Sequence, residues 1–281
     1  MSLSTAAPPT ERHVAIALAG ADGSLLHSQD PDRPFYAAST IKLHVLMAVL
    51  NAVDAGHLDL DRTEPARRTF TGVDGAPFTL FGDHLDPTHP ADGQPITVRE
   101  LAVRMIDRSS NEGTDHLIEL VGLPAVATAI DGLGLTATRA ERLIGDAAAI
   151  DQGLTLETTP ADLVRTVRAI VGTSSNLQPD HRVLTREAMS AQRITIIASA
   201  LRPEVPVGSK SGWVDGYRHD VAFIGDPDGP EVRYLAVMTS GMVKAEADEV
   251  IRARVRELLP DLARGWSAGL HRHPARSARC W

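Results

Sequence analysis

Ser39 and Lys42 stand three positions apart at the start of an apolar stretch with helical periodicity, "FYAASTIKLHVLMAVL". Positions i and i+3 share a helix face, so the hydroxyl and the amine are expected to meet. Apolar neighbours lower the pKa of a buried amine, and a neutral amine can take the proton of a serine hydroxyl. The pair predicts a nucleophile with its base, although a capping serine beside a surface lysine gives the same pattern.

Two later segments carry groups that suit the same chemistry. Ser109 and Asn111 lie in "RSSNEGT", at a break between two expected helices, and Lys210 lies in "GSKSGWV", just before a strand that begins near His219. The chain has three lysines, and two of them fall in these motifs. The ordered set S-x-x-K, S-x-N and K-[ST]-G is typical of penicillin-recognising serine enzymes.

These motifs resemble those of class A β-lactamases and related serine hydrolases over nearly the whole chain, with Ser110 where β-lactamases usually have aspartate. The resemblance implies that Ser39 is the nucleophile and Lys42 its base. Ser109 would then pass a proton, fed by Lys42 and Lys210, to the leaving nitrogen. The resemblance also implies that Asn111 contacts a substrate amide and that Ser211, Gly212 and Arg218 bind the substrate. Lys210, Ser211 and Arg218 would hold its carboxylate. The backbone N–H groups of Ser39 and Trp213 would form the oxyanion hole.

The sequence departs from the family in the loop at 137–160. The E-x-x-L-N pattern, whose glutamate activates the deacylating water, is missing, and Ile144 matches the glutamate position. Arg142 fits one half of the ion pair at the loop base, but Leu156 replaces its acidic partner. We therefore expect intact acylation and slow deacylation, in which the nearby carboxylates Glu141, Asp146 and Asp151 could assist.

Strand patterns occupy both ends of the chain and helical patterns its middle. Residues 13–29 and 219–240 each read as a hairpin, the first around Asp22-Gly23. This predicts an α/β (α+β) fold of the β-lactamase/transpeptidase type. An antiparallel sheet built from both termini would be covered by the first and last helices, with a helical lobe inserted. The expected domains are 1–62 with 203–281, and 63–202 with the second motif.

The sequence gives further predictions for single segments of this fold. Residues 66–94 read as a long loop near a cleft between the two lobes. Thr97 and Glu100 form a capping box at the start of a helix, residues 185–201 read as one helix, and a last amphipathic helix spans 244–265. His84, His89 and His219 read as ordinary polar residues, and the basic tail 271–281 as a flexible end.

Composition narrows the functional classes. The chain has 281 residues, a formal net charge of −8 and a single cysteine, Cys280. The acidic balance argues against nucleic acid and anionic membranes as partners, and no metal-binding spacing occurs, so we expect no cofactor. The N-terminus lacks the pattern of a secretory signal, which predicts a cytoplasmic protein. The oligomeric state stays open.

Three functions fit these motifs. The first is a serine hydrolase that acylates Ser39 with β-lactams or related esters and amides. Such an enzyme would take part in β-lactam breakdown and the response to antibiotics. The second is a transacylase, in which an amine takes the acyl group. The third is a binding or sensing protein that is acylated once. Each would take a small substrate with a carbonyl and a carboxylate.

Overall fold

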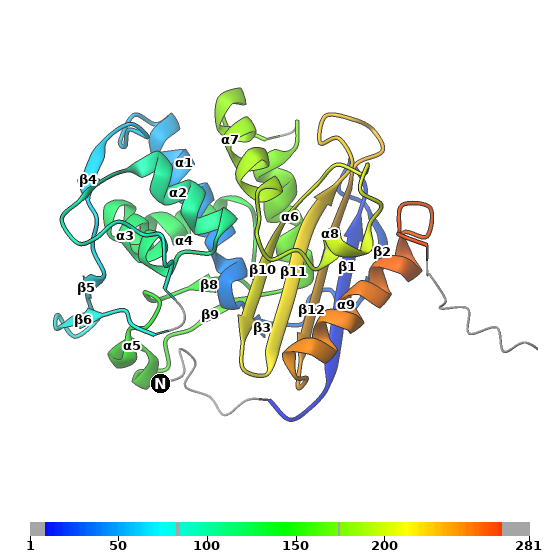
Figure 1. The fold of residues 1–281 in the computed structure, drawn as a ribbon, viewed down its shortest axis with the longest axis horizontal. Helices are drawn as coiled ribbons and strands as arrows, with labels where there is room; N and C mark the ends of the chain where they lie inside the picture. Colours follow the sequence, from blue (N-terminus) through cyan, green and yellow to red (C-terminus); the bar gives the residue numbers. More distant parts are fainter. Residues whose placement is uncertain (1–8, 83–84, 174, 266–281) are drawn as a thin grey trace, which may run out of the picture.

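The computed structural model describes residues 9–82, 85–173 and 175–265. Its main sheet is antiparallel and five-stranded, in the order β10-β11-β12-β1-β2 (Figure 1). Strands from both ends of the chain therefore form one sheet, as the sequence predicts. The bounds are His13–Ala19 (β1), Leu25–Gln29 (β2), Val207–Val214 (β10), Tyr217–Ile224 (β11) and Arg233–Ser240 (β12).

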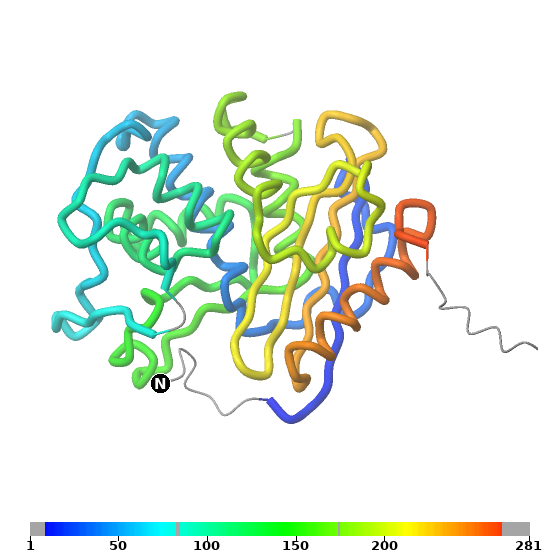
Figure 2. The backbone as a smooth tube through the Cα atoms, viewed as in Figure 1, coloured from blue at the N-terminus to red at the C-terminus, as the bar shows by residue number. Residues whose placement is uncertain are grey.

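Strand β1 joins the two ends of the chain, because it pairs with β2 on one side and with β12 on the other (Figure 2). Its side chains alternate between two apolar clusters. Ala15 and Ala17 belong to the larger cluster, and Ile16 and Leu18 to the smaller one. Successive residues of a strand point to opposite faces, so β1 is buried on both sides, whereas the edge strand β2 is exposed.

Helices cover the two faces of this sheet. Helices α8 (Ile197–Ala200) and α9 (Lys244–Leu258) pack on one face, and α6 (Pro160–Val171) packs on the other, against β1, β11 and β12. The expectation that the first helix covers the sheet is wrong. Helix α1 (Lys42–Asp54) packs mainly against α3 and α4, and less against α2 and α6, because it is apolar on nearly every side and must be enclosed by other helices.

Helices α2 to α5 gather on the other side of the molecule from α9, and α7 packs beside β10 (Figure 1). The Thr97 hydroxyl accepts a hydrogen bond of 3.1 Å from the Glu100 N–H, so the predicted cap at the start of α2 is confirmed. The bounds are Val98–Asp107 (α2), Asn111–Val121 (α3), Leu123–Gly132 (α4), Ala147–Asp151 (α5) and Pro179–Ser190 (α7).

Two predicted helix boundaries are wrong. Residues 185–201 form parts of α7 and α8, because the Gln192 side chain interrupts the helix by donating to the Ile106 carbonyl (2.9 Å) and accepting from the Ile194 N–H (3.2 Å). Helix α9 ends at Leu258, since Pro260 restricts the residue before it.

Several strands are too short to produce a sequence signal. Two of them, β5 and β6, form a hairpin inside residues 66–94, which the sequence presents as a loop. The bounds are Phe35–Tyr36 (β3), Thr63–Pro65 (β4), Thr69–Thr71 (β5), Pro77–Thr79 (β6), Pro95–Thr97 (β7), Arg139–Ala140 (β8) and Leu156–Thr158 (β9).

The predicted division at residues 62/63 and 202/203 stays a prediction, although α6, from the middle of the chain, packs on the sheet. His84, Cys280 and the tail 271–281 lie outside the described residues. Within the described part of the chain, no helix is both long and apolar enough to cross a membrane.

Candidate active site

Ser39 lies in η1 (Ala38–Ile41), a short 3₁₀ turn that leads directly into α1. Strand β10 passes very close to this turn. A Cβ atom on Gly212 would lie 3.0 Å from the Ala37 carbonyl oxygen and 3.2 Å from Cγ2 of Thr40, so a side chain at Gly212 would push the two elements apart. The approach brings Trp213 into the same two cavities as Ser39. This placement suits the predicted oxyanion hole, which itself stays a prediction.

Lys42 is fully buried at the first position of α1. Its amine contacts the Ser109 carbonyl oxygen at 2.6 Å, Oδ1 of Asn111 at 2.7 Å and Oγ of Ser109 at 3.2 Å. The first two oxygens can only accept hydrogen bonds. A neutral amine therefore donates both hydrogens to them and keeps its lone pair for a hydroxyl proton.

Ser109 connects the two buried lysines. Its hydroxyl lies 3.0 Å from Nζ of Lys210 as well as 3.2 Å from Nζ of Lys42. Its backbone has a φ of 60°, a left-handed conformation that is costly for a non-glycine residue. The bond from Lys42 to the Ser109 carbonyl helps to hold this strained conformation. The lysine–serine–lysine contact forms a path for protons.

Burial sets the electrostatics of both amines. Burial lowers the pKa of Lys42 well below its usual range, and the charge of Lys210 lowers it further. Burial also lowers the pKa of Lys210 to about 7. Two charged amines that contact the same hydroxyl repel each other. A proton on one lysine therefore lowers the pKa of the other and favours its neutral form. The lowered pKa of Lys42 and its bonds to two acceptor oxygens suit the predicted role as the base, which stays a prediction.

The other predicted binding residues meet at a cavity of about 260 Å³, which Ser39, Ser109, Asn111, Ser211 and Arg218 help to line. Arg218 was expected to hold a substrate carboxylate. It lines this cavity but is only 3% exposed, and its Nε bonds to Oδ1 of Asp248 at 2.6 Å. Its charge is therefore shared with α9, and its role toward a substrate stays a prediction.

Ile144 lines a second, smaller cavity beside Ser39. Its backbone N–H donates to Oδ1 of Asp115 at 2.8 Å, and Asp115 is completely buried in α3. Burial raises the pKa of the Asp115 carboxyl well above its usual range. Asp115 anchors the loop over the site. The sequence analysis missed it, although its position four residues after Asn111 places both residues on one helix face.

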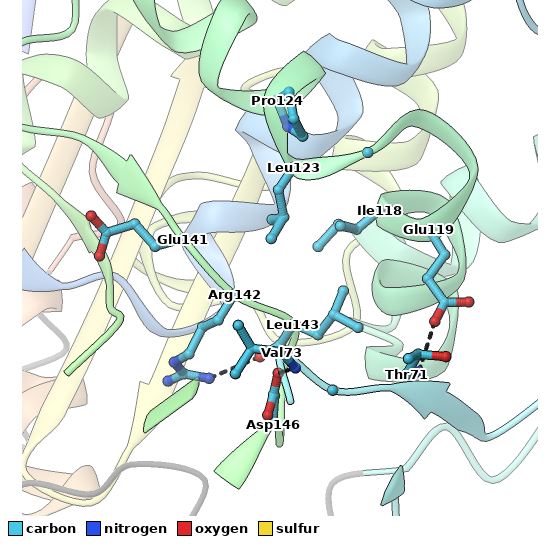
Figure 3. A pocket seen from close by; sticks show the side chains of 12 residues that line it. Thr71, Val73, Ile118, Glu119, Leu123, Pro124, Glu141, Arg142, Leu143 and Asp146 are labelled. Carbon is cyan, nitrogen blue, oxygen red and sulfur yellow. Dashed lines mark hydrogen bonds between the residues drawn. The ribbon is translucent and has the colours of Figure 1, made fainter. Parts of the chain in front are cut away.

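The loop carboxylates lie away from Ser39. Asp146 accepts hydrogen bonds from the backbone of Ala149 (3.0 Å) and Val73 (2.8 Å), and Glu141 accepts one from Thr155 (2.9 Å). Both acids line another cavity, of about 300 Å³, which Ser39 does not line (Figure 3). Asp151 is exposed at the end of α5. None of the three lines either cavity that contains Ser39, so the expectation that one assists deacylation has no support in this geometry.

Comparison with known proteins decides the family. The model of the "Beta-lactamase enzyme family" matches residues 13–259. The chain belongs to this family. A beta-lactamase from Sphaerobacter thermophilus is 26% identical with a TM-score of 0.75, covering 90% of this chain and 92% of its own. A beta lactamase from Xanthomonas campestris pv. campestris is 25% identical with a TM-score of 0.73 and the same coverages. An ancestral class A beta-lactamase is 25% identical with a TM-score of 0.72, covering 90% and 95%.

Membership of the beta-lactamase family establishes the predicted fold and supports a β-lactamase-like serine hydrolase. The site agrees with this at its acylating half, where Lys42, Ser109 and Lys210 form one network that reaches the cavity of Ser39. Ser110 has a structural place: its hydroxyl caps α3 by accepting from the Gly113 N–H at 3.0 Å, and it donates to Glu112.

At the base of the loop in this beta-lactamase family member, Arg142 forms no ion pair with a described carboxylate. Its guanidinium instead donates to the carbonyls of Leu143 (3.0 Å) and Leu154 (3.2 Å) and to the Tyr36 hydroxyl (2.9 Å). The ion pair between β8 and β9 is made by Arg139 and Glu157. Leu156, at the position of the missing acid, instead lines the smaller cavity of Ser39.

Two cations at the site were missed. Lys244, the third lysine of the chain, lines the larger cavity and lies 4.7 Å from the centre of the Trp213 ring. Arg108 lines the same cavity and pairs with Asp107. Lys244 has no sequence signal, because it reaches the site through tertiary packing. Arg108 directly precedes Ser109 in "RSSNEGT", and this position was a signal that could have found it. His219 bonds to the Tyr36 carbonyl and the Thr239 N–H, and the described residues contain no cluster that could hold a metal ion.

Proposed function

We propose that the chain is a serine hydrolase that forms an acyl-enzyme on Ser39 with β-lactams or related esters and amides, and that it loses the acyl group slowly. One observation carries this proposal: the Lys42–Ser109–Lys210 network adjoins the larger cavity of Ser39, while Ile144, which matches the glutamate position of the family, lines the smaller one.

The acylation step follows from this arrangement. Lys42 takes the hydroxyl proton of Ser39, and Oγ of Ser39 forms a bond to the substrate carbonyl carbon. Backbone N–H groups of Ser39 and Trp213 would stabilise the oxyanion, each worth about 3 kcal/mol. The bond from the carbonyl carbon to the leaving nitrogen or oxygen then breaks. Ser109 delivers a proton to that atom and is reprotonated by the lysines.

The described residues offer no comparable set of groups for deacylation. A water molecule that attacks the ester needs a base, and the residues that line the smaller cavity carry no carboxylate among those described. Losing such a base typically slows this step by roughly 10²- to 10⁴-fold. We therefore expect a burst near one equivalent of hydrolysed lactam, followed by slow turnover.

The test combines burst kinetics on a chromogenic cephalosporin with intact-mass spectrometry minutes after mixing with a penicillin. An adduct should form on the native chain and on Ser28→Ala, which changes an exposed serine of β2, but not on Ser39→Ala. Labelling of the Ser39→Ala variant would refute the assignment of the nucleophile. Penicillin turnover on the order of 10² per second without an adduct would refute slow deacylation.

The lack of a water-activating group also favours a second candidate, a cytoplasmic transacylase. In this case an amine would take the acyl group from Ser39. Adding a primary amine during turnover distinguishes the two, because a transacylase forms the amide faster than the acid. If neither product accumulates, the chain is a one-time acyl-binding or sensing protein.

A further inference from the structure

Ser39 stands between two cavities of very different size. The smaller measures about 40 Å³ and the larger about 260 Å³. Ser39, Asn111 and Trp213 line both of them. The smaller cavity is completed by Tyr36, Ala38, Ile144, Leu156 and Val214, and the larger by Leu85, Arg108, Ser109, Ile194, Ser211, Arg218 and Lys244.

The position of Ser109 fixes which part of a substrate enters which cavity. Ser109 joins both lysines and delivers the proton that the leaving group needs. It lines the larger cavity and not the smaller one. The leaving group must therefore occupy the larger cavity, and the acyl chain, on the other side of the carbonyl carbon, points to the smaller one.

The smaller cavity has room for only a short acyl chain. A water-sized group needs about 10–15 Å³ in this measure of volume, so 40 Å³ holds about three such groups. Its walls are held in place. Asp115 anchors Ile144, Arg142 holds Tyr36 through its hydroxyl, and Lys244 lies over the Trp213 ring. A long acyl chain would have to break these contacts or turn out into solvent.

The larger cavity suits a bulky anion. Arg108, Arg218 and Lys244 line it, and none of its described lining residues is acidic. Asp107 and Asp248 offset the charges of the two arginines, but Lys244 contacts an aromatic ring, which leaves its charge in place. The larger cavity therefore attracts a negatively charged leaving group, whereas no cation lines the smaller cavity among its described residues.

We propose that, among substrates whose leaving group carries the carboxylate implied by the family resemblance, this chain prefers those with a compact acyl group, of acetyl to propionyl size. This rests on the proposed acylation of Ser39 and names the substrate class for it. Tyr36, Ile144, Leu156 and Trp213 limit the acyl group, and Lys244 contributes to the preference for an anion.

Four aryl esters test the proposal: acetyl and phenylacetyl esters of phenol and of 3-hydroxybenzoic acid. Release of the phenol gives kcat/KM for each, and intact mass gives the adduct. For the 3-carboxyphenyl esters, acetyl should exceed phenylacetyl at least tenfold. Leu156→Ala, which enlarges the smaller cavity, should reduce this ratio below threefold. Val243→Ala, at an exposed apolar residue that lines neither cavity, should leave the ratio unchanged.

The same kcat/KM values show the effect of the carboxylate on the leaving group. The 3-carboxyphenyl acetate should exceed phenyl acetate at least fivefold, and Lys244→Met should reduce this preference. Phenylacetyl transfer to Ser39 as fast as acetyl transfer would overturn the size limit while leaving the proposed function intact. An unchanged ratio in a folded Leu156→Ala variant would do the same. Absence of any Ser39 adduct with all four esters would overturn the proposed function itself.

Discussion

Replacing Ile144 by glutamate should restore deacylation. Ile144 is 7% exposed and lines the cavity of Ser39, so a carboxylate there would reach a water molecule near the acyl carbon. A positioned general base contributes roughly 10²- to 10⁴-fold. Burial that left only a third of the carboxylate ionised at pH 7 would reduce the gain about threefold. We therefore expect deacylation of Ile144→Glu to be roughly 30- to 3,000-fold faster.

The assay follows decay of the penicillin adduct by intact mass after the free penicillin is removed. Ile144→Gln is the matched control, because it has the same shape and the same loss of apolar burial, about 1.5–3 kcal/mol, but no base. Thermal unfolding of both variants checks that they are folded. Equal acceleration by glutamine and glutamate would show that loosened packing admits water. No acceleration by either, in folded variants, would refute the placement of Ile144 beside the acyl group.

Four further outcomes follow from the buried network, the cap of α3 and the buried histidines. Lys42→Arg should slow Ser39 adduct formation at least 10²-fold, since arginine keeps its proton, and near-normal labelling would refute a base role. Ser109→Ala should slow adduct formation by 10²-fold or more. Ser110→Ala should instead lower stability by about 1 kcal/mol and leave labelling nearly unchanged, which urea unfolding and mass spectrometry compare. Burial lowers the pKa of His44 and of His219 to about 4. The unfolded chain therefore binds more protons between pH 6.5 and 4, and stability should fall as pH falls through this window, by up to about 3 kcal/mol per histidine, as urea midpoints at pH 7 and 4.5 would show.

The residues proposed for acylation could be singled out because their patterns are local in sequence. Ser39 and Lys42 are neighbours on one turn, and the segments around Ser109 and Lys210 have recognisable composition. That these groups meet on one hydroxyl could be expected only from the family resemblance, because 101 positions separate Ser109 from Lys210. The hairpins at both ends were predictable from alternation and turn residues, which are also local signals.

The parts that could not be predicted depend on contacts between distant segments. Nothing next to Gln192 in sequence shows that its side chain will bond to α2 and end a helix. Lys244 and Asp115 belong to amphipathic helices, where a charged residue usually faces solvent, and only packing brings one to the Trp213 ring and the other to the Ile144 N–H. Strands of two or three residues, such as β3 and β8, carry no periodicity.

The strand order of the main sheet has a consequence for synthesis of the protein. Strand β1 leaves the ribosome early, but its partner β12 and the strand that carries Lys210 and Trp213 are made last. A nascent chain that already contains Ser39 therefore has neither the second lysine nor the close contact between Gly212 and η1. Its serine is an ordinary alcohol until the last quarter of the chain has folded onto the first. We therefore expect the chain not to react with acyl donors while it is being made, and a truncated product to carry an unreactive Ser39.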